Sequence, residues 1–96
     1  MKSQLNTRDA QRLHKMVADY ADALRGAESC ARIAAEHRAV SLLSDMNPFP
    51  NAIRAKTYAE MADGASREAK RRSKKALRTQ LAIYKLIERL STPKEA

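Results

Sequence analysis

The segment Asn47-Pro48-Phe49-Pro50-Asn51 lies near the middle of the 96-residue chain and decides its fold. Two prolines two residues apart cannot lie inside a helix, and each biases the residue before it away from helical dihedral angles. Asn51 is a good N-cap for a helix that begins at Ala52. On both sides of the segment most residues are strong helix formers, and no run alternates like a β-strand. The sequence therefore predicts an all-α protein: an antiparallel hairpin of two long helices.

Before the turn, apolar residues recur in alternating steps of three and four, which is the heptad spacing of a coiled coil. We expect the first helix over about residues 8–46, with this repeat at Leu13, Met16, Tyr20, Ala23, Ala27, Cys30 and Ala34. The repeat runs through Gly26, which favours a continuous helix. However, Ile33 and Leu43 lie on a different face from Leu13, as a break near Gly26 would produce. A three-helix bundle therefore stays open as an alternative.

After the turn, the same steps hold throughout residues 55–90 and predict one helix over about residues 52–91. The repeat consists of Ala55, Tyr58, Ala62, Ala65, Ala69, Ser73, Ala76, Gln80, Ile83, Ile87 and Leu90. In an antiparallel hairpin, facing residues have numbers that sum to about 98, so that alanines face alanines at mid-length. We expect residues 1–96 to form a single helical domain, packed closely through alanines, with residues 92–96 as a short tail.

The formal net charge of +8 is unevenly distributed. Through residue 47, seven basic residues face six acidic ones, whereas the rest of the chain has twelve basic and five acidic residues. Most of the excess lies in residues 66–78, SREAKRRSKKALR, where Glu68 is the only acid. On a helical wheel one stripe is formed by Arg67, Lys70, Arg71, Lys74 and Arg78, with Lys75 at its edge and Arg72 near the helix interface.

This stripe is about 15–18 Å long and could neutralise several phosphates of a nucleic acid backbone. The same stripe could instead dock on an acidic protein surface, or be an ordinary solvated helix face. No zinc finger, aromatic RNA-binding motif or leucine zipper accompanies it, so sequence-specific base recognition is not indicated.

Apolar residues outside the main repeat point to a partner. Leu77, Leu81 and Tyr84 form a second strip, and Val17 and Leu24 form another on the first helix. Either a third helix, produced by a break at Gly26, covers these strips, or two copies of the chain cover them by pairing into a four-helix bundle. Phe49 either folds back onto its own hairpin or offers an exposed aromatic anchor for a partner.

The chain shows no arrangement of residues that indicates catalysis. His14 and His37 are far apart, and Cys30, which is the single cysteine, falls among the alanines of the repeat as a small buried thiol. We therefore expect no enzyme activity, metal, cofactor or small-molecule substrate. The N-terminus has no apolar run like that of a secretory signal, and no segment has the ~18–20 apolar residues that cross a membrane. A cytoplasmic protein without membrane contact is expected.

The short length, the basic alanine-rich helices and the lack of a catalytic arrangement together resemble the accessory proteins of phages and mobile elements as a class. The sequence predicts a non-enzymatic accessory protein that binds nucleic acid non-specifically through its phosphate backbone. The alternative is an adaptor or inhibitor that docks on another protein, such as a nucleic-acid-processing enzyme. A purely structural assembly protein is the third option.

Overall fold

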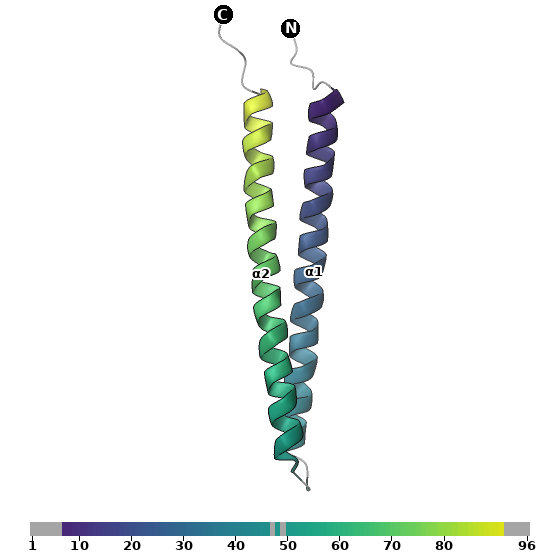
Figure 1. Ribbon diagram of the computed structural model, residues 1–96, viewed down its shortest axis with the longest axis vertical. Coiled ribbons are helices and arrows are strands. Elements are labelled where there is room, and N and C mark those ends of the chain that lie inside the picture. Colours follow the sequence, from purple (N-terminus) through teal and green to yellow (C-terminus); the bar gives the residue numbers. More distant parts are fainter. Residues whose placement is uncertain (1–6, 47, 49, 92–96) are drawn as a thin grey trace, which may run out of the picture.

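The protein is a long antiparallel helical hairpin (Figure 1). The computed structural model describes residues 7–46, 48 and 50–91, in which helix α1 spans Thr7–Met46 and helix α2 spans Ala52–Ser91. No strand occurs among these residues. Each helix has 40 residues and is therefore about 60 Å long. The expected fold and both helix boundaries are confirmed to within one residue, whereas Phe49 and the tail at 92–96 lie outside the described residues.

Asn51 organises the start of α2, as its position after the prolines predicts. Its side-chain Oδ1 accepts a hydrogen bond from the backbone N–H of Arg54 at 2.9 Å, which satisfies one of the free donors of the first helical turn. Its own backbone N–H donates to the carbonyl oxygen of Ser44 at 3.1 Å, so the same residue also binds the last turns of α1. These two bonds fix how the chain leaves one helix and enters the next.

Helix α1 is unbroken at Gly26, so the three-helix alternative is wrong. The heptad repeat continues past Ala34 through the half-buried His37 and the buried Ser41 and Ser44, while Leu43 is 66% exposed. After Ala34 the inward face of α1 therefore contains serines, and apolar side chains such as Leu43 lie on the exposed face. The helix itself is continuous. The buried Ser41 hydroxyl compensates by donating to the carbonyl oxygen of Ala55 across the hairpin at 2.7 Å.

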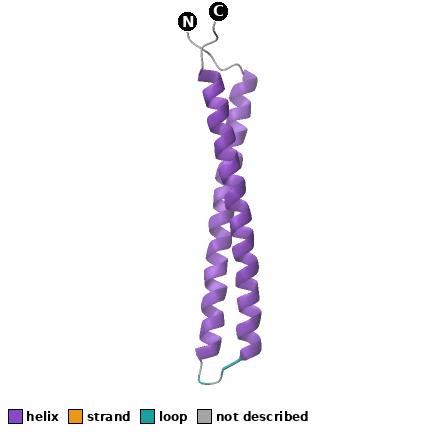
Figure 2. Cartoon of the chain, turned by 90° about the vertical axis from the view of Figure 1, so that its left-hand side faces the viewer, coloured by secondary structure: helices purple, strands orange, loops and turns teal. Residues whose placement is uncertain are grey.

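The core consists mainly of alanine. Ala62 is fully buried, and Ala23, Ala27, Ala34, Ala55 and Ala76 are nearly so. Ala65, Ala69 and Cys30 are half-buried, which is less burial than the repeat predicts. Figure 2, viewed at right angles to Figure 1, shows one helix passing in front of the other, as in helices that wind around each other.

The register at the open end of the hairpin differs from the predicted one. Ser73 and Ile87 are exposed, and Leu86 is buried in place of Ile87. After the buried Ile83, the next inward position of α2 is therefore Leu86, three residues later, where the sequence repeat took a step of four to Ile87. Steps of three and four are interchangeable on a wheel, so apolarity alone did not decide between the adjacent Leu86 and Ile87.

Two helices alone leave much apolar surface in contact with solvent. The radius of gyration is 21.4 Å, against about 12.5 Å for a compact globular chain of this length. Among the described residues no large side chain is fully buried, and twelve large hydrophobic side chains are exposed. Neither helix, within residues 7–46 and 52–91, is long and apolar enough to cross a membrane.

Candidate nucleic-acid interface

The positive charge of the protein is concentrated on one helix. Helix α1 has six basic and six acidic residues, whereas α2 has eleven basic and four acidic residues, a net charge of +7. All seven basic side chains of residues 66–78 are exposed. Because Ala69 and Ala76 face α1, Arg67 and Lys74 of the stripe lie on the far side of α2. Arg71 and Arg78 lie toward one side of the hairpin, where they line a cleft with residues of α1.

Glu68 neutralises part of this charge. Its carboxylate accepts hydrogen bonds from Arg71 Nε at 3.0 Å and Arg72 Nε at 2.9 Å, and it also forms an ion pair with the Arg71 terminal nitrogen. Hydrogen bonds from Arg71 and then Arg72 lower the pKa of Glu68 to about 2, and the same carboxylate raises the pKa of Arg71. Glu68 therefore remains charged at any physiological pH and orients two guanidinium groups.

The other five cations of the segment are available to a ligand. Within the described part of the chain no ion-pair partner is found for Arg67, Lys70, Lys74, Lys75 and Arg78. These residues repel one another at short range on a single helix, and an external polyanion would relieve that repulsion. They are the part of the segment best suited to bind phosphate.

Arg72 lies against α1 instead of pointing outward. Its Cδ atom would be 3.1 Å from a Cβ at Gly26, and its terminal Nη1 would be closer still. Gly26 thus provides the space for the Arg72 side chain to cross the interface, which explains a glycine inside an unbroken helix. The sequence placed Arg72 near the interface but did not connect it to Gly26.

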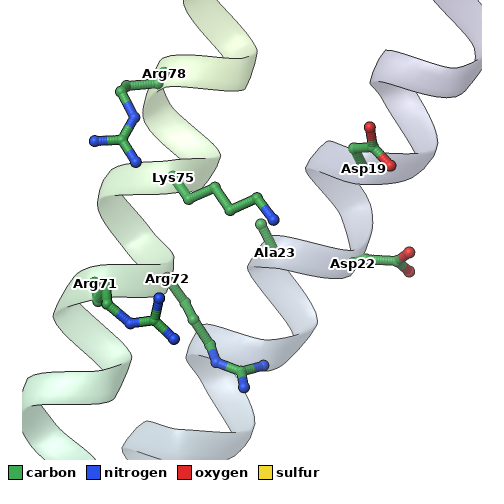
Figure 3. Close-up of a pocket in the computed structure, with 7 residues that line it drawn as sticks. All are labelled: Asp19, Asp22, Ala23, Arg71, Arg72, Lys75 and Arg78. Atoms are coloured by element: carbon green, nitrogen blue, oxygen red, sulfur yellow. The ribbon is translucent and has the colours of Figure 1, made fainter.

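A cleft of about 350 Å³ opens on one side of the hairpin beside this arginine. It is lined by Asp19, Asp22, Ala23, Arg71, Arg72, Lys75 and Arg78. Figure 3 shows Lys75 and Arg72 extending from α2 toward α1, and Asp22 pointing away from the cleft. Asp22 is paired with Arg25 on its own helix. Four cations on one wall and two carboxylates on the other suit an anion held against α2.

The remaining predicted site residues do not join the basic segment in one pocket. Leu77, Leu81 and Tyr84 are exposed, as expected of a partner surface. His37 is half-buried against Tyr58 of α2, with ring centroids 5.5 Å apart, so it lies at the helix interface. Among the described residues no cluster of three or more His, Cys, Asp or Glu side chains could hold a metal ion.

The sequence reasoning missed the role of Glu68 as a clamp on two arginines. The signal was present, because Glu68, Arg71 and Arg72 are spaced by three and four residues, the distances at which helical side chains meet. No protein-family model matches the chain, and no curated protein sequence or solved structure is significantly similar to it.

Proposed function

We propose that this is a non-enzymatic basic helical protein of the cytoplasm that binds nucleic acid non-specifically through the phosphate backbone. The observation that carries the proposal is the set of five exposed cations on α2 without ion-pair partners. It is supported by the neutrality of α1, which leaves a single strongly basic helix in the molecule.

The length of the basic segment suits a phosphate backbone. From Arg67 to Arg78 the helix rises about 16 Å, and a duplex strand with one phosphate every 3.4 Å of axis presents about five phosphates over that distance. Each neutralised phosphate releases counterions, so the affinity of such a protein falls steeply with salt concentration. Residues 66–78 contain no aromatic, Asn or Gln side chain, and this supports backbone binding without stacking on bases.

A second candidate function is an adaptor or inhibitor that docks on an acidic protein surface, of the kind found in phages and mobile elements. Leu77 and Leu81 favour it, because they follow Lys70 and Lys74 in steps of three and four along the same side of α2. Protein interfaces combine an apolar core with a polar rim, and this strip has an apolar part beside a cationic part. Two classes of partner, nucleic acid or protein, therefore compete for one surface.

The test compares two triple variants that lose the same charge. The first is Arg67→Gln, Lys74→Gln and Arg78→Gln in the stripe. The second, the matched control, is Arg8→Gln, Lys15→Gln and Arg32→Gln on α1, where the side chains are also exposed. Fluorescence anisotropy measures the affinity for single-stranded and duplex nucleic acid of unrelated sequence, over about 50 to 200 mM salt.

If the stripe binds phosphate, the first variant lowers the slope of log affinity against log salt by about 2–3, which is 0.7–0.9 for each of three contacts. The control variant leaves most of that slope in place. Equal losses in both variants would mean that net charge, and no particular surface, governs binding. Weak binding of the unmodified protein even at low salt would overturn the proposal and leave the acidic protein surface as the candidate partner.

A further inference from the structure

One broad side of the hairpin has an apolar surface built from both helices. Arg38 of α1 contacts two residues of α2 on this side: its guanidinium is 3.6 Å from an Asp63 carboxylate oxygen and 3.2 Å from the Ser66 hydroxyl. Residues that are multiples of seven apart share a flank of a coiled-coil helix. On α1, Val17 and Leu24 therefore lie on the same flank as Arg38. On α2, Ile87 lies on the flank of Ser66, and Tyr84 lies on the flank of Asp63.

With Leu77 beside Tyr84 and Leu81 at the outer edge, these residues form what we call the apolar face. Its members are Val17, Leu24, Leu77, Leu81, Tyr84 and Ile87, and each is between 36% and 57% exposed. The helical spacing alone indicates Leu77, Leu81 and Tyr84 as one strip on α2, and Val17 and Leu24 as another on α1. The contacts of Arg38 place the two strips on one side of the hairpin.

We propose that a second copy of this chain covers the apolar face, with the two hairpins parallel and related by a two-fold axis along their length. The dimer uses Lys70, a residue of the basic stripe, but does not depend on which ligand the other stripe residues bind. At roughly 80 Å² for each side chain, the six residues expose about 500 Å² on each protomer. Because apolar atoms supply about 60% of an interface, two such faces correspond to about 1,600 Å², the size of a specific protein interface.

The charges on this side also fit a second copy. Glu28 lies one turn after Leu24 on α1, and Lys70 lies two turns before Leu77 on α2. Neither has an ion-pair partner within the described residues. Gly26 contacts Arg72, so residues at the same level of the two helices have residue numbers that sum to about 98. The numbers of Glu28 and Lys70 have the same sum, so these two residues lie at one level, on opposite edges of the apolar face.

The two-fold axis along the hairpin exchanges these edges. Glu28 of one protomer then faces Lys70 of the partner subunit, and Lys70 faces Glu28 of the partner subunit, which gives two complementary pairs. The same operation places α1 against α2 of the second copy, so the two neutral α1 helices separate the two strongly basic α2 helices. An antiparallel arrangement would place α1 against α1 and leave both charges unmatched.

The test uses two charge reversals, Glu28→Lys and Lys70→Glu, and sedimentation equilibrium to measure the dimer dissociation constant. Each variant alone has two like-charged pairs in its homodimer, and its dimer is weakened by at least roughly 5-fold. A mixture of the two variants restores both opposite-charge pairs in the heterodimer and therefore associates more tightly than either variant alone. No effect confined to the fold of one protomer produces that recovery on mixing.

Leu77→Gln tests the apolar contribution, with Leu43→Gln as the matched control, because Leu43 is equally apolar and exposed but lies off the apolar face. The first change weakens the dimer by roughly 30-fold or more, since it acts twice in a two-fold interface. The control changes the dissociation constant little, and circular dichroism verifies that both variants remain helical. A monomeric mass at tens of micromolar protein, a dissociation constant left unchanged by Leu77→Gln, or the absence of recovery on mixing would overturn the proposal.

Discussion

Leu86 and Ile87 are adjacent apolar residues, and the sequence repeat placed Ile87 at the helix interface, whereas the structure places Leu86 there. Alanine substitution at each position therefore tests the register of the hairpin. Leu86 is 3% exposed and Ile87 is 43% exposed. Leu86→Ala removes three buried carbon groups, at about 0.8 kcal/mol each, which gives about 2.4 kcal/mol before any cavity term. The open end of a two-helix hairpin collapses readily onto a void, so we expect a total of about 2.5–3 kcal/mol, near the low end for such changes.

Ile87→Ala removes a side chain that is already half in solvent, and we expect a loss of about 1 kcal/mol. The assay is urea denaturation followed by circular dichroism, with the free energy of unfolding compared between variants at unchanged slope. Because Ile87 belongs to the apolar face, the measurement is made at two protein concentrations, and the order of the two variants should persist at both. Equal losses, or a larger loss for Ile87→Ala, would show that the helices pack in the register that the sequence repeat predicted.

Three further perturbations follow from the packing and charges. Ala62→Leu places a branched side chain at a position without free space, and urea denaturation should show a loss of about 1–3 kcal/mol from overpacking; no loss would mean that the helices are further apart. Gly26→Ala should stabilise the helix by about 1 kcal/mol in an Arg72→Ala background, but by clearly less when Arg72 is present, since the new methyl group displaces its side chain; equal effects in both backgrounds would contradict the contact. The pKa of Glu68 is lowered to about 2, so the stability that it contributes is present at neutral pH and is lost only as the pH falls from about 4.5 toward 2. An NMR titration should place its midpoint near 2 and find it shifted upward in Arg71→Gln; a midpoint near 4.5 in the unmodified protein would exclude the clamp.

The amino-acid sequence predicted the hairpin well because its decisive signals are local. Two prolines, an Asn cap and a step of three or four residues each act within one or two helical turns, and no long-range information is needed to read them. The same locality explains the errors. A wheel drawn for one helix cannot decide between Leu86 and Ile87. It also suggests a break near Gly26, because the apolar Ile33 and Leu43 lie on a different face from Leu13.

The candidate site also combines local features, which the sequence predicted, with features that depend on the register between the two helices. That the cations of residues 66–78 share an exposed side of one helix is a local property, and the helical wheel predicted it. That Arg72 lies over Gly26, and that Val17 and Leu24 share a surface with Leu77, depends on the register between two segments about fifty residues apart. That register is set by contacts such as the one between Ser41 and Ala55, where the apolar pattern gives no guide.

The hydrogen bond from Ser41 to Ala55 also has a consequence for the order of folding. In this hairpin the sequence separation of facing residues grows steadily with distance from the turn, from fourteen at Ser41 and Ala55 to forty-six at Gly26 and Arg72. The entropy lost on closing a loop rises with its length, so contacts beside the turn lose the least entropy when they form. Each contact then shortens the loop that the next contact must close. The chain is thus expected to fold as a zipper from the proline turn toward its two ends, with the directional bond of Ser41 fixing the register before the alanines meet.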